Sequence, residues 1–73
     1  MKRYLDLSGD SGVVAYELRP DAIKVKFRGS DRVYVYSHAS AGATHVARMK
    51  RLAEAGRGLS TYISRHVHDR YER

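Results

Sequence analysis

Alternation of apolar and polar side chains marks three short stretches in the first half of the chain. Residues 22–28 (AIKVKFR) alternate strictly, with apolar side chains on one face and basic side chains on the other, as in a half-buried antiparallel strand. Residues 13–19 (VVAYELR) and 32–38 (RVYVYSH) are rich in β-branched and aromatic residues, which favour strands. Turn-forming residues at positions 20–21 and 29–31 separate the stretches. The pattern predicts a three-stranded antiparallel meander.

After residue 40 the apolar spacing changes to three or four, which is typical of an amphipathic helix. We expect a first helix over residues 40–55, with Ser40 as its N-cap and Gly56 as the left-handed residue that ends it. A second helix is expected from about Ser60. Its apolar side comprises Leu59, Tyr62, Ile63, Val67 and Tyr71. Because a small sheet needs one face covered, the predicted fold is α+β, a three-stranded antiparallel β-meander followed by two α-helices packed on one face.

A chain of 73 residues is expected to form one small domain with a thin core, because a chain of this size buries only ~60% of its unfolded surface. We expect residues 1–73 to form that domain, with the core at about residues 13–71. Residues 1–12 end in a loop rich in Ser, Gly and Asp. The residues before this loop either add a short edge strand or stay loose, and the sequence leaves their role open.

The composition excludes several classes of protein. The chain has no cysteine, so disulfides, zinc knuckles and thiol chemistry are excluded and a reducing compartment is favoured. No apolar run approaches the ~20 residues of a membrane span, and the N-terminus lacks the apolar segment of a secretory signal. We therefore expect a cytoplasmic protein with no membrane partner.

The charge balance of the chain is strongly basic. Lys and Arg number 14 and Asp and Glu number 8, which gives a formal charge of +6. Such a balance fits an anionic partner such as RNA, DNA or a phosphate-rich surface. The alternative is that the charge only keeps a small protein soluble.

The C-terminal segment carries the densest set of chemically active side chains. On a helix, Arg65 and Asp69 are four residues apart and able to pair, and His66 and Arg70 form a second line that favours an anion. His66 and His68 are more than half a helical turn apart, so no metal site is expected. With four histidines in the chain, acid–base combinations arise by chance. We therefore assign no catalytic residue and expect neither an enzyme nor a cofactor.

Tyr34 and Tyr36 are two residues apart on the third predicted strand, so their rings share one face. The register against the preceding strand decides which face this is. A loop of three residues, starting at Gly29, pairs Lys26 with Tyr34 and puts both rings on the basic outer face. A loop of two residues pairs Val25 with Tyr34 and puts both rings in the core.

Each register leaves different side chains in water. If the tyrosines enter the core, Val33 and Val35 are exposed. Tyrosine commonly buries its ring and keeps its hydroxyl at a wet rim, which supports the core register. Exposing two valines costs more than exposing two amphipathic rings, so the composition slightly favours the tyrosines outward. The sequence leaves both registers open.

Basic side chains beside exposed aromatic rings are typical of single-stranded nucleic-acid binding, in which bases stack on the rings and Lys or Arg contact the backbone. This combination makes RNA the expected partner. The candidate contact residues are Lys24, Lys26, Arg28, Tyr34, Tyr36, Arg65, His66 and Arg70.

The order of these features resembles the KTSC domain, a short domain found at the C-terminus of some lysyl-tRNA synthetases and in small stand-alone bacterial proteins. The resemblance rests on the central Tyr-x-Tyr at residues 34–36 and on the block YISRHVHDRY at residues 62–71. The chain departs from the family pattern in three ways: Val35 inside Tyr-x-Tyr, a longer loop before that strand, and no Pro before the first helix. The family has no established activity, although RNA binding has been suggested for it. The resemblance implies Arg65 and His66 as candidate contacts.

These features together predict a small RNA-binding module with a basic and aromatic surface. A different class fits them too: a protein-interaction module or small homodimer, with no nucleic-acid or catalytic role, that meets its partner through the exposed face of the sheet.

Overall fold

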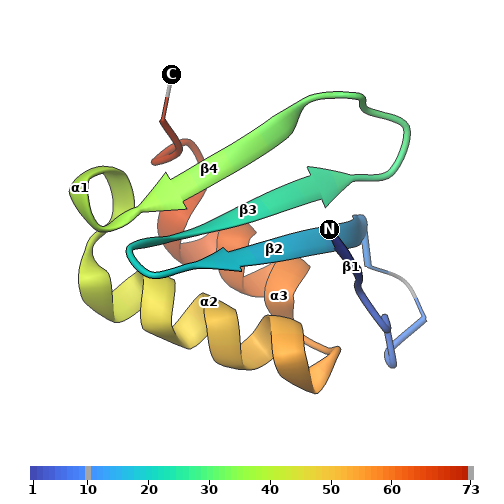
Figure 1. The fold of residues 1–73 in the computed structure, drawn as a ribbon. Helices are drawn as coiled ribbons and strands as arrows, with labels where there is room; N and C mark the ends of the chain where they lie inside the picture. The colour runs from blue at the N-terminus through green and yellow to red at the C-terminus, as the bar shows by residue number, and fades with distance from the viewer. Residues whose placement is uncertain (10, 73) are drawn as a thin grey trace.

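Four antiparallel strands form the sheet of the computed structural model, which describes residues 1–9 and 11–72 (Figure 1). The strands, in sheet order, are β1 (Lys2–Arg3), β2 (Val13–Arg19), β3 (Ala22–Phe27) and β4 (Val33–Ser37). The α+β class is confirmed, and β2, β3 and β4 pair with one another in the predicted antiparallel order. The predicted number of strands was too small, because the two-residue β1 pairs with β2 and adds an edge strand.

The helical part of the chain is more broken than the sequence predicts. Its elements are α1 (His38–Ala41), α2 (Ala43–Ala55), α3 (Leu59–Tyr62) and the π-helical turn η1 (Ile63–Val67). The first helix begins earlier than expected, because Ser37 and Ser40 cap each other's backbone N–H groups at 3.0 Å in a capping box. Gly42, with φ 93°, then separates α1 from α2, and the predicted Gly56 ends α2 at φ 78°.

The second predicted helix is shorter than expected. Helix α3 continues directly into η1, and the last helical residue is Val67. His68 then adopts φ 27° and turns the chain away. Tyr71 therefore packs against the core from the C-terminal tail and does not extend the apolar side of a helix.

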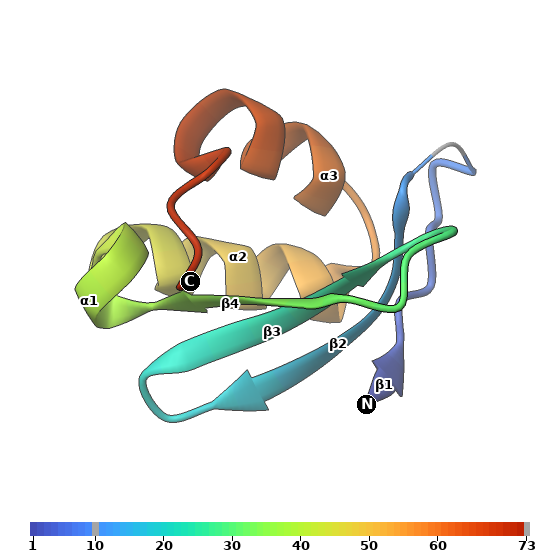
Figure 2. The same cartoon turned by 90° about the horizontal axis from the view of Figure 1, so that it is seen from above.

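The helices lie on one face of the sheet, as Figure 2 shows. The core between the two layers is closed by side chains with no more than 1% exposure. The largest of these are Tyr36, Ile23, Met49, Leu59, Val13, Val25, Val46 and Val67. Among the described residues no helix covers the opposite face of the sheet, which remains open (Figure 2). None of the described helices is long and apolar enough to cross a bilayer.

The register of β3 and β4 puts the tyrosines on the helix side of the sheet. Val25 pairs with Tyr34, and Ile23 pairs with Tyr36. The slight preference for tyrosines on the outer face was therefore wrong. The connection between the strands spans residues 28–32, and the Ser30 N–H closes a turn onto the Phe27 carbonyl at 3.3 Å. The expected exposure of the two valines holds for Val33, which is 40% exposed on the open face, whereas Val35 is partly buried.

The N-terminal segment belongs to the packed structure. Tyr4 is 3% exposed and joins the core, although it lies outside the expected core range of about 13–71. Its hydroxyl accepts a hydrogen bond from the Leu59 N–H at 3.3 Å. The Leu7 N–H donates to the Gly56 carbonyl at 2.7 Å, so the segment fastens the turn between α2 and α3.

Candidate nucleic-acid interface

The basic candidates of the sheet lie at two places. Lys24 and Lys26 alternate with buried residues of β3 and so lie on the open face, where Lys24 Nζ is 3.9 Å from a carboxylate oxygen of Glu17. Arg28 is in the β3–β4 turn, with 70% of its side chain exposed and its guanidinium 3.9 Å from Asp6. Such exposed pairs contribute little to stability and leave the cations accessible.

The C-terminal candidates lie on the helical side of the sheet. Arg65 and His66 are exposed residues of η1, and Arg70 is exposed in the tail. Arg65 with Asp69, and His66 with Arg70, were expected four residues apart on one helix. The helical segment ends at Val67, so Asp69 and Arg70 lie beyond it. The eight candidates therefore form no single surface: Lys24 and Lys26 lie on one face of the sheet and the C-terminal residues beyond the other.

Tyr36 is a wall residue and not a stacking platform. Only 1% of it is exposed, and its hydroxyl donates a hydrogen bond to the His68 carbonyl at 3.1 Å. Burial, together with the nearby Tyr71, Tyr34 and Asp69, raises the pKa of Tyr36 to about 12. Its phenol is therefore a neutral hydrogen-bond donor at physiological pH.

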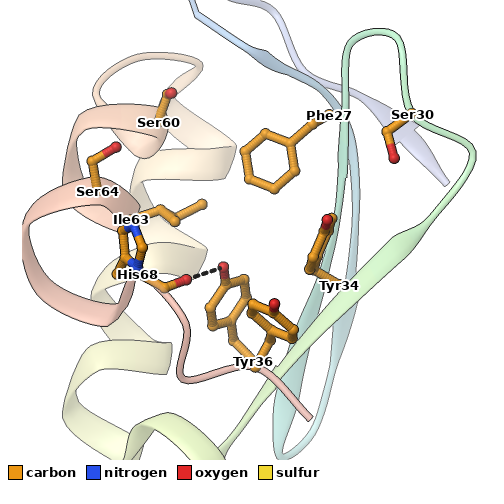
Figure 3. Close-up of a pocket in the computed structure, with 9 residues that line it drawn as sticks. Phe27, Ser30, Tyr34, Tyr36, Ser60, Ile63, Ser64 and His68 are labelled. Carbon is orange, nitrogen blue, oxygen red and sulfur yellow. Dashed lines mark hydrogen bonds between the residues drawn. The ribbon is translucent and has the colours of Figure 1, made fainter. Parts of the chain in front are cut away.

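Tyr34 and Tyr36 line a cleft of about 300 Å³ between the β3–β4 hairpin and the segment α3–η1 (Figure 3). We call it the aromatic cleft. Figure 3 shows Phe27, Ser30 and Tyr34 on the strand side and Ser60, Ile63 and Ser64 on the helix side. The full lining consists of Phe27, Ser30, Tyr34, Tyr36, Ser60, Ile63, Ser64, His68 and Tyr71.

The aromatic rings of the cleft hold one another edge to face. The Tyr34 ring centroid is 5.4 Å from that of Phe27 and 4.7 Å from that of Tyr71, and Tyr71 lies 6.0 Å from Tyr36. Perpendicular pairs at these distances are favourable, because the positive edge of one ring meets the negative face of the other. The tail contributes Tyr71, while the period of two along β4 contributes the other two tyrosines.

Arg32 lies against this aromatic group and was missed by the sequence analysis. Its guanidinium carbon is 4.8 Å from the centroid of Tyr34 and 5.2 Å from that of Tyr71, within the range of a cation–π contact. The Arg32 N–H also donates to the Ser30 hydroxyl at 3.2 Å. The pattern of residues 32–36 indicated only strand, so no local signal connected Arg32 with a tail residue far along the chain.

The described lining of the aromatic cleft contains no Asp, Glu, Lys or Arg. Its polar groups are the three serine hydroxyls, the tyrosine hydroxyls and His68. Hydroxyls both donate and accept hydrogen bonds. The cleft therefore suits a flat, neutral group with a polar edge, and the charge of Arg32 lies beside it.

His66 belongs to a separate cluster with His45 and Tyr62. The Tyr62 hydroxyl and His45 Nδ1 share a hydrogen bond of 2.6 Å, and the His66 ring lies 4.4 Å from Tyr62 and 5.8 Å from His45, between centroids. Two imidazoles and a phenol fall short of the ligand set of a zinc site. No group of three or more His, Cys, Asp or Glu positioned for a metal ion is found among the described residues.

A comparison of the chain with protein-family models, with curated proteins and with solved structures returns no match in any of the three.

Proposed function

We propose that this protein is a small RNA-binding module, similar to the KTSC domain, that holds single-stranded RNA beside the aromatic cleft. The observation that carries the proposal is the Arg32 guanidinium over the rings of Tyr34 and Tyr71. Single-stranded RNA presents phosphates, which bind cations, and unpaired bases, which stack on aromatic rings. This site has a cation and an aromatic cleft side by side. A cytoplasmic location is part of the proposal.

Phosphate contacts come from arginines close to the cleft in sequence. Arg65 follows the cleft residue Ser64, and Arg70 precedes Tyr71; both are exposed. In the described part of the chain neither forms an ion pair. Arg28 belongs to the same turn as Arg32, but its guanidinium lies 3.9 Å from Asp6, at a hollow separate from the cleft. In the proposal an RNA strand at the cleft meets Arg32 on the strand side and Arg65 and Arg70 on the helix and tail side.

Lys24 and Lys26 have a smaller role in this proposal than the sequence indicated. They lie on the open face of the sheet, away from the cleft. Their charge attracts RNA at long range, which raises the rate of encounter. A strand seated in the cleft has no direct path to them except around the edge of the sheet.

Fluorescence anisotropy of a labelled single-stranded RNA across a range of salt concentrations tests the proposal. Affinity should fall steeply with salt, because each phosphate contact on a single strand adds roughly 0.7 to the slope of log affinity against log salt. Arg32→Ala should weaken binding and lower that slope. The matched control is Arg48→Ala, which removes an equal charge from the exposed side of α2 and should leave the slope unchanged. Absence of binding at low salt, or equal effects of the two variants, would contradict the proposal.

A second function is favoured by the open face of the sheet, where Val33 is 40% exposed and shares the face with Val35 and Ala15. On this face Lys24 and Lys26 of β3 lie between Ala15 of β2 and the two valines of β4, and the face fits a second copy or another protein. Sedimentation at increasing protein concentration tests it. Association that Val33→Lys abolishes would support the interaction module, whereas a monomer at all concentrations counts against the homodimer.

A further inference from the structure

We propose that the aromatic cleft takes up one unpaired nucleobase, out of the stack of the RNA strand, while its phosphate stays outside near Arg32. This inference rests on the proposed function and adds the part of the ligand that enters the protein. It concerns a single base, and it needs no platform of exposed rings.

The size of the cleft fits one flat heterocycle. A volume of about 300 Å³ is at the lower end of the range for small-molecule sites, so a base fits and a stack of bases does not. The cleft is bounded by rings and one aliphatic side chain on its strand and helix sides (Figure 3). Such walls contact the faces of a base without reading its identity, since every base has a π face.

The polarity of the cleft separates a base from its phosphate. A phosphate or carboxylate inside the cleft would lose its hydration with no charged lining residue to replace it. A neutral base has no such cost, and its polar edge meets the hydroxyls of Ser60 and Ser64 on the helix side (Figure 3). The guanidinium of Arg32, in contact with two cleft tyrosines, supplies charge for the phosphate outside.

The hydroxyl groups also favour a nucleobase over a wholly apolar guest. Ser30, Ser60 and Ser64 come from the turn, α3 and η1, so three separate elements bring a hydroxyl to the same cleft. A benzene-like group has no partner for them, whereas the edge of a base presents donors and acceptors. The extrusion of a base is least costly from a single strand, which agrees with single-stranded RNA as the ligand.

Two oligonucleotides of equal charge test the inference directly. One is a sugar–phosphate strand that is abasic at every position, and the other is the same strand with a single adenine at its centre. The strand with the base should bind roughly tenfold or more tightly, as expected for one base stacked on aromatic side chains. Equal affinity of the two strands overturns the inference and leaves the proposed function intact. Failure of both strands and of ordinary single-stranded RNA to bind overturns the proposed function itself.

A variant in which the cleft is filled by a larger side chain tests whether the base binds there. Ser64→Phe puts a ring into the cleft from η1 and should remove the advantage of the adenine strand while keeping the affinity for the abasic strand. Thr61→Phe is the matched control, because Thr61 is exposed on α3 and does not line the cleft. If Ser64→Phe keeps the full advantage, the base binds elsewhere and the inference is wrong.

Competition by a free nucleoside distinguishes a nucleobase site from a site that binds any aromatic group. Adenosine should compete with the adenine strand in the unmodified protein, a measurement that does not depend on any variant folding. An aromatic amino-acid amide should compete far less, because it lacks the polar edge that meets the serine hydroxyls. Equal competition by the two compounds would overturn the assignment to a nucleobase.

Discussion

Replacement of Tyr36 by Phe tests two effects of one buried hydroxyl on stability: its hydrogen bond at neutral pH and the cost of ionising it at high pH. At neutral pH the change removes the hydrogen bond from the Tyr36 hydroxyl to the His68 carbonyl, which is 3.1 Å long. The ring stays in its place, since Phe has the same shape and the residue is 1% exposed. A typical hydrogen bond contributes about 0.5–1.5 kcal/mol. We therefore expect Tyr36→Phe to lower the free energy of unfolding by about 1 kcal/mol.

At high pH the wild type should become less stable to unfolding than Tyr36→Phe. The pKa of Tyr36 rises from 10.0 to about 12 on folding, chiefly because burial penalises the phenolate. A group whose pKa is higher in the folded state contributes its full stability below the unfolded pKa and loses it as the pH rises toward the folded pKa. In this window the wild type loses stability relative to Tyr36→Phe at about 1.4 kcal/mol per pH unit. The two free energies should become equal near pH about 11, where this loss matches the lost hydrogen bond.

Urea unfolding followed by far-ultraviolet circular dichroism measures this, since the backbone signal does not change when tyrosines ionise. Both proteins are unfolded in the same buffers, from neutral pH upward, so the ionisation of lysines and of tyrosines away from Tyr36 affects them alike; ionised Tyr34 and Tyr71 oppose the Tyr36 phenolate and so change the difference in the expected direction. The difference between their free energies should be constant up to pH about 9 and shrink above pH about 10. A difference that stays constant or widens across the alkaline range would refute the assignment of a buried, neutral Tyr36.

Three further substitutions test the packing by urea unfolding at neutral pH. Gly56→Ala should destabilise the protein by more than about 1 kcal/mol, because Gly56 has φ 78° and an added Cβ lies 2.7 Å from the Cβ of Leu5; a neutral effect would refute the close approach. Met49→Ala empties a fully buried site and should cost about 2–5 kcal/mol. Ser37→Ala removes the cap of α1 and should cost about 1 kcal/mol, whereas the exposed Ala47 changed to Ser should cost only a few tenths.

Strand positions were predictable because burial alternates with the same period of two as the side chains of a strand. In β3, Ile23 and Val25 have 0% exposure while Lys24 and Lys26 stay half-exposed. The register of the next strand was not predictable, because the chain between them spans five residues that fit more than one turn. A shift of one residue reverses the faces of a whole strand, so the location of the tyrosines could not be read from their spacing.

The helix ends were harder to predict than the helices. The C-terminal Gly56 follows a clear rule, since only glycine adopts its left-handed conformation without strain. At the other end both Ser37 and Ser40 satisfy the preference for an N-cap, and only the folded chain shows that they cap each other. The π-helical turn and the reversal at His68 leave no periodic signal in the sequence. The helix that was expected to carry both Arg65 and Asp69 therefore ends before Asp69.

The candidate site depends on a return of the chain that no local pattern encodes. The Glu72 N–H donates to the Val35 carbonyl at 2.7 Å, so the tail lies along the free edge of β4. This contact shields part of an edge that would otherwise be open to pairing with another strand. It also brings Tyr71 against Tyr34 and beside Arg32. The same segment therefore protects the sheet and completes the aromatic cleft.

Binding and folding are consequently coupled at some cleft residues and separable at others. Tyr36 and Ile63 are buried parts of the core, so their replacement lowers stability as well as any affinity. Arg32 is exposed, and its contact with two rings contributes only about 0.5–1 kcal/mol at a surface. Ser64 is exposed as well. A loss of RNA affinity on changing either exposed residue, in a protein whose unfolding is unchanged, therefore reports on recognition and not on the fold.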